Sequence, residues 1–334
     1  MDSLENIINN WPWILKVNTF FIAIFLVFII IGIGFLTYFR IRKNRREKLK
    51  HIYQENTDEF LNNYMFNDDF DIKREIEDFK IKHLNTSLKK KITLRQILVY
   101  NENFTGESSV LIKKIFQELE LDQFVFDILK KGEWYDKARA IYALSELFVI
   151  NPKLVAPYLN SKREEVREQA IYYFLKTATE DPLSFFKNLK EELTLWELIY
   201  VEDSIKYVYS GKIPDFSYWL NHHLSTVVIF SIRMIQYFNQ FENVPKITPF
   251  LDHENPLIRK ETIKALYKLQ YENLLEQVLT SFEKEEEVVK KEIIKAIQAI
   301  GNITQLKKLK VYINNQDKNI QLTYLQAEKS LLVN

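Results

Sequence analysis

Four prolines recur at nearly equal intervals in the second half of the chain. Pro152, Pro182, Pro214 and Pro245 are separated by 30, 32 and 31 residues. A fixed period of this length is typical of a solenoid of stacked helical hairpins, because each hairpin needs a neighbour to cover its apolar face. The period constrains the fold more than any other feature, and it favours a binding role over chemistry.

The apolar residues in the second helix of each hairpin repeat with the same period. The reference position falls at residues 140, 170, 231, 262, 293 and 324, with one doubled step of 61 residues. Apolar residues also stand four positions before, one after and three after most of these reference positions. Such a stripe is one face of an α-helix, and it predicts a neighbouring helix that covers it.

Local signals predict where some of these helices begin. Asn151-Pro152 and Asn255-Pro256 are typical of a helix start, since asparagine caps the first free N–H groups and proline fits the first turn. Ser161 with Glu164 predicts a capping box at the start of another second helix.

Pro182 indicates one more hairpin, over residues 182–210, which the apolar alignment misses. With only six glycines and no cysteine, the chain is unsuited to a β-rich or disulfide-stapled fold. We therefore predict an all-α fold: one transmembrane helix followed by an α-solenoid of about seven or eight helical hairpins, wound as an armadillo-type superhelix.

One long apolar run lies near the N-terminus. Residues 20–39, FFIAIFLVFIIIGIGFLTYF, contain no charged residue. As a helix this run is about 30 Å long, which matches the hydrocarbon core of a bilayer. The residues before it lack the basic start of a cleavable signal peptide, and no small-residue cleavage site follows. We predict a retained transmembrane helix; the alternative is a buried helix of a soluble protein.

Basic residues cluster directly after this run. Residues 40–50 contain seven basic residues and one acidic residue, whereas residues 1–19 contain one lysine. The seven are Arg40, Arg42, Lys43, Arg45, Arg46, Lys48 and Lys50. The positive-inside rule then places the N-terminal tail outside and everything after residue 40 in the cytoplasm. The cluster either contacts anionic lipid as well or acts only as a topology signal.

These features divide the chain into four parts. Residues 1–19 form a short extracytoplasmic tail, and residues 20–39 form the membrane helix. Residues 40–91 are the basic juxtamembrane segment and a polar, partly helical stalk, and residues 92–333 are the repeat solenoid. The predicted protein spans the cytoplasmic membrane once, with its repeat domain in the cytoplasm.

Two second helices in particular resemble the HEAT repeat. They are SKREEVREQAIYYFL, which begins at Ser161, and NPLIRKETIKALYKL, which begins at Asn255. The resemblance, to the short bacterial form of the repeat, implies an α-solenoid that binds other proteins on its concave face. It also maps a basic position of the family onto Lys137, Arg167, Arg259 and Lys290. In the family that residue pairs with an acidic one in the preceding turn, which implies Asp252 for Arg259.

Signs of chemistry are absent from the sequence. There is no thiol nucleophile, and the chain holds no G-x-S-x-G, Walker or G-x-G-x-x-G motif. Adjacent His222 and His223 point about 100° apart on a helix and do not suit one metal ion. The near-neutral body lacks the basic face that nucleic-acid binding needs. We expect no enzyme activity, no cofactor, no metal and no nucleic-acid partner.

Residues 213–241 are unusually poor in charge, with only Asp215 and Arg233 charged. A helix of this kind is either deeply buried or covered by a partner, and burial in the middle of the array explains much of it. The partner interpretation predicts a docking surface of aromatic and histidine side chains. These are Tyr218, Trp219, His222 and His223, extended on the preceding repeat by Trp196 and Tyr200.

The sequence thus predicts a membrane-tethered scaffold that holds a protein partner on its solenoid. A single membrane helix before HEAT-like repeats also resembles bacterial proteins encoded near cell-surface polysaccharide glycosyltransferases. That resemblance implies a membrane-embedded glycosyltransferase as a candidate partner. Two alternatives remain open: an enzyme that uses the solenoid groove, and a sensor of anionic lipid that acts through residues 40–50.

Overall fold

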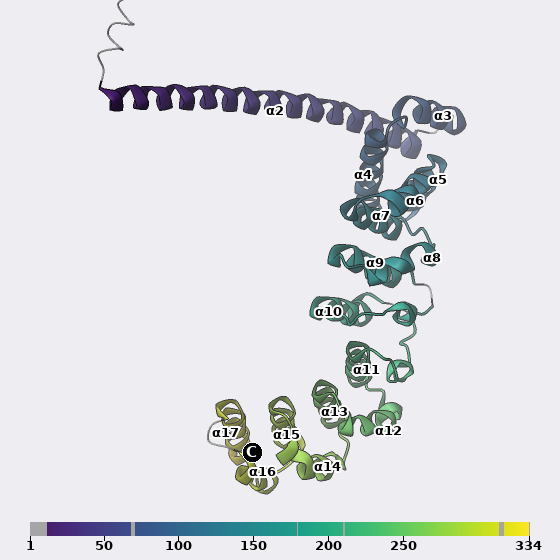
Figure 1. The fold of residues 1–334 in the computed structure, drawn as a ribbon. Coiled ribbons are helices and arrows are strands. Elements are labelled where there is room, and N and C mark those ends of the chain that lie inside the picture. The colour runs from purple at the N-terminus through teal and green to yellow at the C-terminus, as the bar shows by residue number, and fades with distance from the viewer. Residues whose placement is uncertain (1–11, 68–70, 179, 210, 314–316, 334) are drawn as a thin grey trace, which may run out of the picture. The chain divides into compact units, whose positions relative to one another are not determined.

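The computed structural model describes residues 12–67, 71–178, 180–209, 211–313 and 317–333 (Figure 1). Residues 1–11 of the predicted tail lie outside the described residues. Every regular element within these ranges is helical, as predicted. The chain divides into two compact units, Met1–Val125 and Phe126–Asn334.

The first unit is built around one very long helix. Its helices are α2 (Trp13–Phe66), α3 (Ile72–His83), α4 (Ser87–Asn103) and α5 (Glu107–Glu118), and α6 (Leu121–Lys131) begins in it. The C-terminal end of α2 packs against α3 and α4, and α4 packs against α5. The rings of Phe60 and Phe79 stack with their centroids 4.0 Å apart, and Leu61 and Ile97 are fully buried.

This packing involves residues of the predicted stalk. Thr57, Phe60, Leu61 and Tyr64 stand on the last turns of α2 and are all buried. The hydroxyl groups of Thr57 and Thr93 also lie 3.4 Å apart, which ties α2 to α4. The part of the chain that was predicted as a polar stalk therefore contributes to a hydrophobic core.

Residues 20–39 lie entirely within α2. An 18-residue window of this helix has a mean hydropathy of 3.0, and none of that window is buried. By length and composition α2 is the one helix in the described ranges that is able to cross a bilayer. The predicted basic residues follow on the same helix, and Arg40 through Lys48 are exposed.

The second unit alternates short first helices with longer second helices. The second helices are α7 (Trp134–Glu146), α9 (Glu164–Thr177), α10 (Leu195–Asp203), α11 (Ser225–Tyr237), α13 (Pro256–Lys268), α15 (Glu287–Ile300) and α17 (Lys318–Val333). The α-helical parts of the first helices are α8 (Pro152–Val155), α12 (Val244–Ile247), α14 (Leu274–Ser281) and α16 (Ile303–Leu309). The remaining short turns are η1 (Ala156–Asn160), η2 (Ser184–Asn188), η3 (Ser204–Val208), η4 (Phe216–Trp219), η5 (Phe241–Asn243), η6 (Thr248–Asp252), η7 (Phe282–Lys284) and η8 (Lys310–Tyr312).

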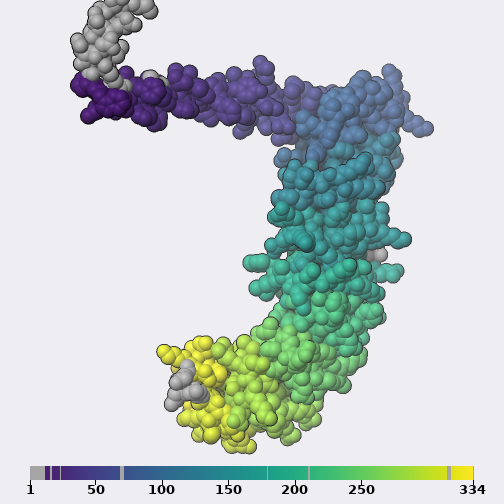
Figure 2. All heavy atoms as spheres, in the orientation of Figure 1, coloured from purple at the N-terminus to yellow at the C-terminus, as the bar shows by residue number. Residues whose placement is uncertain are grey.

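Each second helix packs against the second helix of the next hairpin. Figure 1 shows α7 to α17 as one row, with α8, α12, α14 and α16 along its other side. Figure 2 shows the same hairpins, coloured from teal to yellow, packed into one continuous body. The hairpin predicted from Pro182 is present as η2 and α10, followed by the π-helical turn η3.

The predicted apolar stripe forms the core of this unit. In α9 all four stripe positions, Val166, Ala170, Ile171 and Tyr173, are buried, and the equivalent positions of α11, α13 and α15 are buried too. The last helix differs, since Leu325 of α17 is 58% exposed although it occupies a stripe position. No further second helix follows α17 among the described residues, so this side of the stripe stays open to solvent.

Two of the three predicted helix starts are correct. The side chain of Asn151 accepts a hydrogen bond from the N–H of Leu154, and Asn255 caps α13 in the same way. The capping box at Ser161 is wrong, because its Oγ accepts from the N–H of Arg163 and α9 begins only at Glu164. Capping boxes occur instead at the starts of α10 and α16.

Two of the predicted basic positions, Arg259 and Arg167, tie neighbouring hairpins together. Arg259 donates to the carbonyl of His253, at 2.7 Å, and to the carboxylate of Glu285, at 2.9 Å. Its partners are thus backbone groups of its own loop and an acid of the next hairpin, rather than Asp252. Arg167 likewise reaches forward to the carboxylate of Glu197, at 2.6 Å.

Candidate functional site

The charge-poor segment 213–241 is explained by burial. Eight side chains of α11 are buried, which accounts for its apolar composition. Trp219 is only 5% exposed, and its ring lies edge-on to Phe186 at 5.2 Å. Phe186 makes a similar contact with Phe230 at 5.3 Å. Trp219 is therefore a core residue and offers no surface to a partner in this conformation.

The other predicted residues of this segment have separate environments. Tyr218 is 68% exposed and lies under the ammonium group of Lys187, which is 5.5 Å from the ring centroid. His222 is tied down on both ring nitrogens: Nε2 lies 3.1 Å from the carbonyl of Phe186, and Nδ1 accepts from the N–H of Leu224. Burial lowers the pKa of His222, so the neutral ring fits this structural role. His223 is exposed beside it.

An exposed apolar surface lies one hairpin earlier, on α10. Leu195, Trp196, Ile199 and Tyr200 are all exposed, Trp196 by 72% and Tyr200 by 40%. We call these four residues the α10 surface. The opposite side of the same helix, with Leu198 and Val201, is buried in the core, so α10 is apolar on both faces. The sequence predicted Trp196 and Tyr200 only as an extension of a neighbouring surface.

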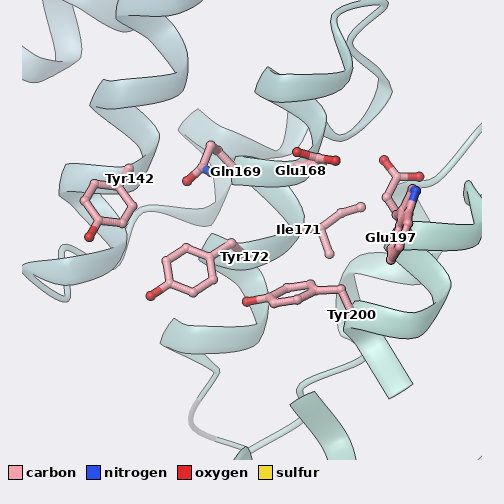
Figure 3. Close-up of a pocket in the computed structure, with 8 residues that line it drawn as sticks. Tyr142, Glu168, Gln169, Ile171, Tyr172, Glu197 and Tyr200 are labelled. Carbon is pink, nitrogen blue, oxygen red and sulfur yellow. The ribbon is translucent and has the colours of Figure 1, made fainter. Parts of the chain in front are cut away.

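The α10 surface borders a hollow between the second helices α7, α9 and α10. The hollow has a volume of about 480 Å³. It is lined by Tyr142, Glu168, Gln169, Ile171, Tyr172, Trp196, Glu197 and Tyr200. We call it the tyrosine hollow, because three successive second helices each contribute one tyrosine to it (Figure 3).

The tyrosine rings form a short ladder. Tyr142 and Tyr172 are nearly parallel, with centroids 6.2 Å apart and an angle of 16° between the rings. Tyr172 and Tyr200 are also 6.2 Å apart and tilted by 49°. In Figure 3 Glu168 and Gln169 lie above this ladder, on α9. A second hollow of about 600 Å³ shares Tyr172 and Tyr200 with the first and extends toward η3.

Hydrogen bonds hold the ladder in place. The hydroxyl of Tyr172 donates to Glu146 and accepts from Lys176 at 2.9 Å, and Lys176 pairs with Glu146 at 2.6 Å. Burial, reinforced by Glu146, raises the pKa of Tyr172 well above its ordinary value. On the other wall, Glu197 is committed to Arg167 and to the capping box of α10. The Tyr172 hydroxyl and the Glu197 carboxylate therefore hold the walls of the hollow in place and are not available to a ligand.

The hollow also holds two hydrogen-bond acceptors, on Gln169 and Glu168. The side-chain oxygen Oε1 of Gln169 is buried and accepts no hydrogen bond from any residue that the structure describes. Glu168 stands at the rim, and partial burial, followed by the charges of Glu164, Glu197 and Glu165, raises its pKa. Both groups are hydrogen-bond acceptors at pH 7. Neither residue was predicted from the sequence.

The structure also bears on a metal site and on the predicted lipid contacts. Within the described ranges no group of three or more His, Asp or Glu side chains is arranged to hold a metal ion. The predicted lipid-contacting residues lie on α2 in the first unit, where Lys50 forms a 3.7 Å ion pair with Glu47.

The fold and the site define the protein as an all-α helical repeat protein with an exposed aromatic surface on its middle hairpins. No protein-family model matches the chain, and none of the curated proteins does. Among solved structures, an engineered protein is 14% identical, with 78% of this chain and 97% of that chain covered and a TM-score of 0.25.

Two designed armadillo repeat proteins are similar to the chain in the same limited way. One is 17% identical, with 71% of this chain and 99% of that chain covered and a TM-score of 0.28. The other, solved in complex with the peptide (KR)4, is 13% identical, with 75% and 98% covered and a TM-score of 0.25. Scores this low carry no inference about the function of this chain.

Proposed function

We propose that this protein is a non-enzymatic scaffold that binds a protein partner through the α10 surface. One observation carries the proposal: a packed repeat helix presents Leu195, Trp196, Ile199 and Tyr200 to solvent while its other face is already buried. Exposed clusters of large apolar side chains on a rigid element are typical of protein–protein interfaces. Trp and Tyr are also the residues that most often dominate binding energy.

In this proposal α2 anchors the scaffold in the cytoplasmic membrane, with the repeats on the cytoplasmic side. The unburied apolar window of residues 20–39 and the basic residues that follow it support this arrangement. Tethering raises the local concentration of anything bound near the bilayer. The partner that gains most is another membrane protein, and we propose a membrane-embedded enzyme of bacterial polysaccharide synthesis, such as a glycosyltransferase.

Site-specific photocrosslinking in native membranes tests this function. A photoreactive amino acid at Ile199 should crosslink one membrane protein in stoichiometric yield. Trp196→Ala should abolish the crosslink, because it removes the most exposed aromatic side chain of the α10 surface. Tyr218→Ala is the matched control, since Tyr218 is equally exposed but lies on η4, outside this surface.

The two variants decide the outcome. If Tyr218→Ala abolishes the crosslink and Trp196→Ala does not, the α10 surface is not the binding site. If Ile199 crosslinks no protein in membranes where the chain is folded, the scaffold function is wrong. Circular dichroism of each purified variant confirms that the helices are intact.

A second candidate function, sensing of anionic lipid, is favoured by the exposed basic residues of α2. Replacing Arg42, Lys43, Arg45 and Arg46 by glutamine should then abolish retention of anionic lipid by the purified protein, measured by native mass spectrometry, while membrane insertion persists. Unchanged lipid retention would reduce the cluster to a topology signal.

A further inference from the structure

We propose that the tyrosine hollow binds an arginine side chain of the protein partner, with the guanidinium stacked on the tyrosine ladder and hydrogen-bonded to Gln169 and Glu168. This inference rests on the proposed scaffold function and names the chemistry that the partner must carry. The α10 surface contributes the apolar part of the interface, and the hollow contributes its charge selectivity.

The first argument is the aromatic lining. Tyr142, Tyr172, Trp196 and Tyr200 are four of the eight residues that line the hollow. Aromatic faces carry negative potential and attract a cation within about 6 Å of the ring centre. Arginine suits such a lining better than lysine, because its planar guanidinium stacks on rings and is less strongly hydrated. The volume of about 480 Å³ lies within the range of roughly 300–1,000 Å³ that is usual for ligand sites.

The second argument is the set of polar groups that the hollow offers. None of its lining residues is a lysine, an arginine or a histidine. The nearby ammonium group of Lys176, 5.2 Å from the Tyr172 ring centroid, is paired with Glu146. Glu197 and the Tyr172 hydroxyl are already committed to partners within the chain. Gln169 Oε1 and the ionised Glu168 carboxylate accept hydrogen bonds and do not donate them. A ligand that satisfies them must donate, and a buried acceptor without a donor is destabilising.

The third argument is electrostatic. Glu164, Glu165 and Glu168 stand on the first two turns of α9, and none of them forms an ion pair within the described ranges. Their mutual repulsion, after the larger effect of partial burial, contributes to the raised pKa of Glu168. A cation in the hollow relieves this repulsion, whereas an acidic side chain increases it. Charge complementarity therefore selects a basic segment and excludes an acidic one.

Ligand-observed NMR tests the inference on the full chain in nanodiscs of phosphatidylcholine, a lipid without net charge. The probes are the peptide acetyl-Gly-Ala-Arg-Ala-Gly-amide and its citrulline counterpart, which keeps the shape and removes the charge. The arginine peptide should bind about tenfold more tightly than the citrulline peptide. Glu168→Gln should weaken arginine binding about three- to tenfold, whereas Glu272→Gln, an exposed glutamate on another hairpin, should leave it unchanged.

A second variant and a pH series test the roles of Gln169 and Glu168 separately. Gln169→Met removes the free acceptor and should weaken binding without lowering stability, because it also removes an unsatisfied buried group. Affinity of the unmodified protein should fall as the pH drops through the raised pKa of Glu168, and this dependence should disappear in Glu168→Gln.

Equal affinity for the two peptides, or unchanged affinity in both Glu168→Gln and Gln169→Met, overturns the inference. A lysine peptide that binds as tightly as the arginine peptide overturns the assignment to arginine. The proposed function is judged separately: a partner that still crosslinks at Ile199 when the peptides show no preference leaves the scaffold intact and removes only the arginine site.

Discussion

Replacing Arg233 by methionine should destabilise the middle of the solenoid by about 3 kcal/mol. Arg233 stands on α11, and its guanidinium bridges two carboxylates on the flanking second helices. Nη1 lies 3.0 Å from Glu202 of α10, and Nη2 lies 3.0 Å from Glu261 of α13. Both carboxylates are buried. The substitution keeps most of the aliphatic volume of the side chain but leaves two buried negative charges short of a partner.

The magnitude follows from what each carboxylate retains. Breaking a buried ion pair from one side costs about 3–5 kcal/mol. Glu202 keeps Lys206 at 3.0 Å, and Glu261 keeps Lys260 at 3.5 Å, so we expect the lower end of this range. The matched control is Lys246→Met, which breaks a 3.8 Å pair whose side chains are 53% and 61% exposed. Exposed pairs contribute only about 0–1 kcal/mol.

The pH dependence identifies the cause as charge. Burial alone raises the pKa of Glu261, but the hydrogen bond and charge of Arg233, helped by Lys264 and Lys260, outweigh it and lower the pKa. A lowered folded-state pKa means that the carboxylate stabilises the protein above its unfolded pKa and that this stability is lost as the pH falls. The difference between Arg233→Met and the unmodified protein should therefore persist down to about pH 4.3, the ordinary glutamate value, and shrink as the pH falls below it.

Hydrogen exchange measured by mass spectrometry is the appropriate assay, because a repeat array opens locally rather than in one global step. At pH 7 a loss of about 3 kcal/mol corresponds to about 100-fold faster exchange in α11 and α13. Lys246→Met should change exchange by less than about fivefold. The reasoning fails if both variants accelerate exchange equally, or if the Arg233→Met effect is as large at about pH 3 as at pH 7.

Two further substitutions test one contact within a hairpin and one contact between neighbouring hairpins. Tyr173→Phe should cost about 1–3 kcal/mol by chemical denaturation, because the hydroxyl accepts a 2.6 Å hydrogen bond from the N–H of Asn151 that phenylalanine cannot replace; an unchanged midpoint contradicts this. Glu192→Gln should cost about 1 kcal/mol at pH 7, since the carboxylate accepts from the N–H groups of Ser225 and Thr226, both at 2.8 Å. Burial alone raises the pKa of Glu192, but these hydrogen bonds outweigh burial and lower that pKa. The cost should therefore vanish as the pH falls through the lowered pKa, and a pH-independent cost would refute the assignment.

The repeat architecture was predictable because folding imposes it on the sequence at a fixed interval. Every second helix must bury the same face against the next one, so the stripe recurs even where the residues differ, as in Ala170 and Ser231. The prediction fails where no neighbouring second helix requires the stripe to be buried. Leu325 occupies a stripe position but is exposed, because α17 is the last described second helix and nothing covers that side of it.

The core of the first unit was not predictable from the same signal. Phe60, Leu61 and Tyr64 lie near the end of a helix whose earlier part is basic and fully exposed. They are covered by α3 and α4, which lie outside the repeat and have no periodic pattern in common with it. Long-range packing of this kind leaves no mark at a fixed interval, so the polar average composition of this segment did not predict it.

The site was predictable only in part, because composition does not say which face of a helix is apolar. An uncharged aromatic residue can be buried, as Trp219 is, or exposed, as Trp196 is. A low charge content does not distinguish these two cases. One signal in the sequence does separate them. Tyr142 and Tyr172 stand two residues after the reference positions of their helices, outside the buried stripe. Packing of the core therefore does not require an aromatic residue at either position.

The same argument applies with more force to α10, and it explains why the site lies in the hairpin that the apolar alignment misses. Leu195, Trp196 and Ile199 are not needed for the core, which Leu198 and Val201 already supply. One period of 31 residues earlier, the same positions hold three glutamates: Glu164, Glu165 and Glu168. A solenoid folds equally well with charged residues on this face, and exposed apolar side chains make it less soluble. Folding therefore does not account for the exposed apolar residues of α10, whereas the proposed binding function does.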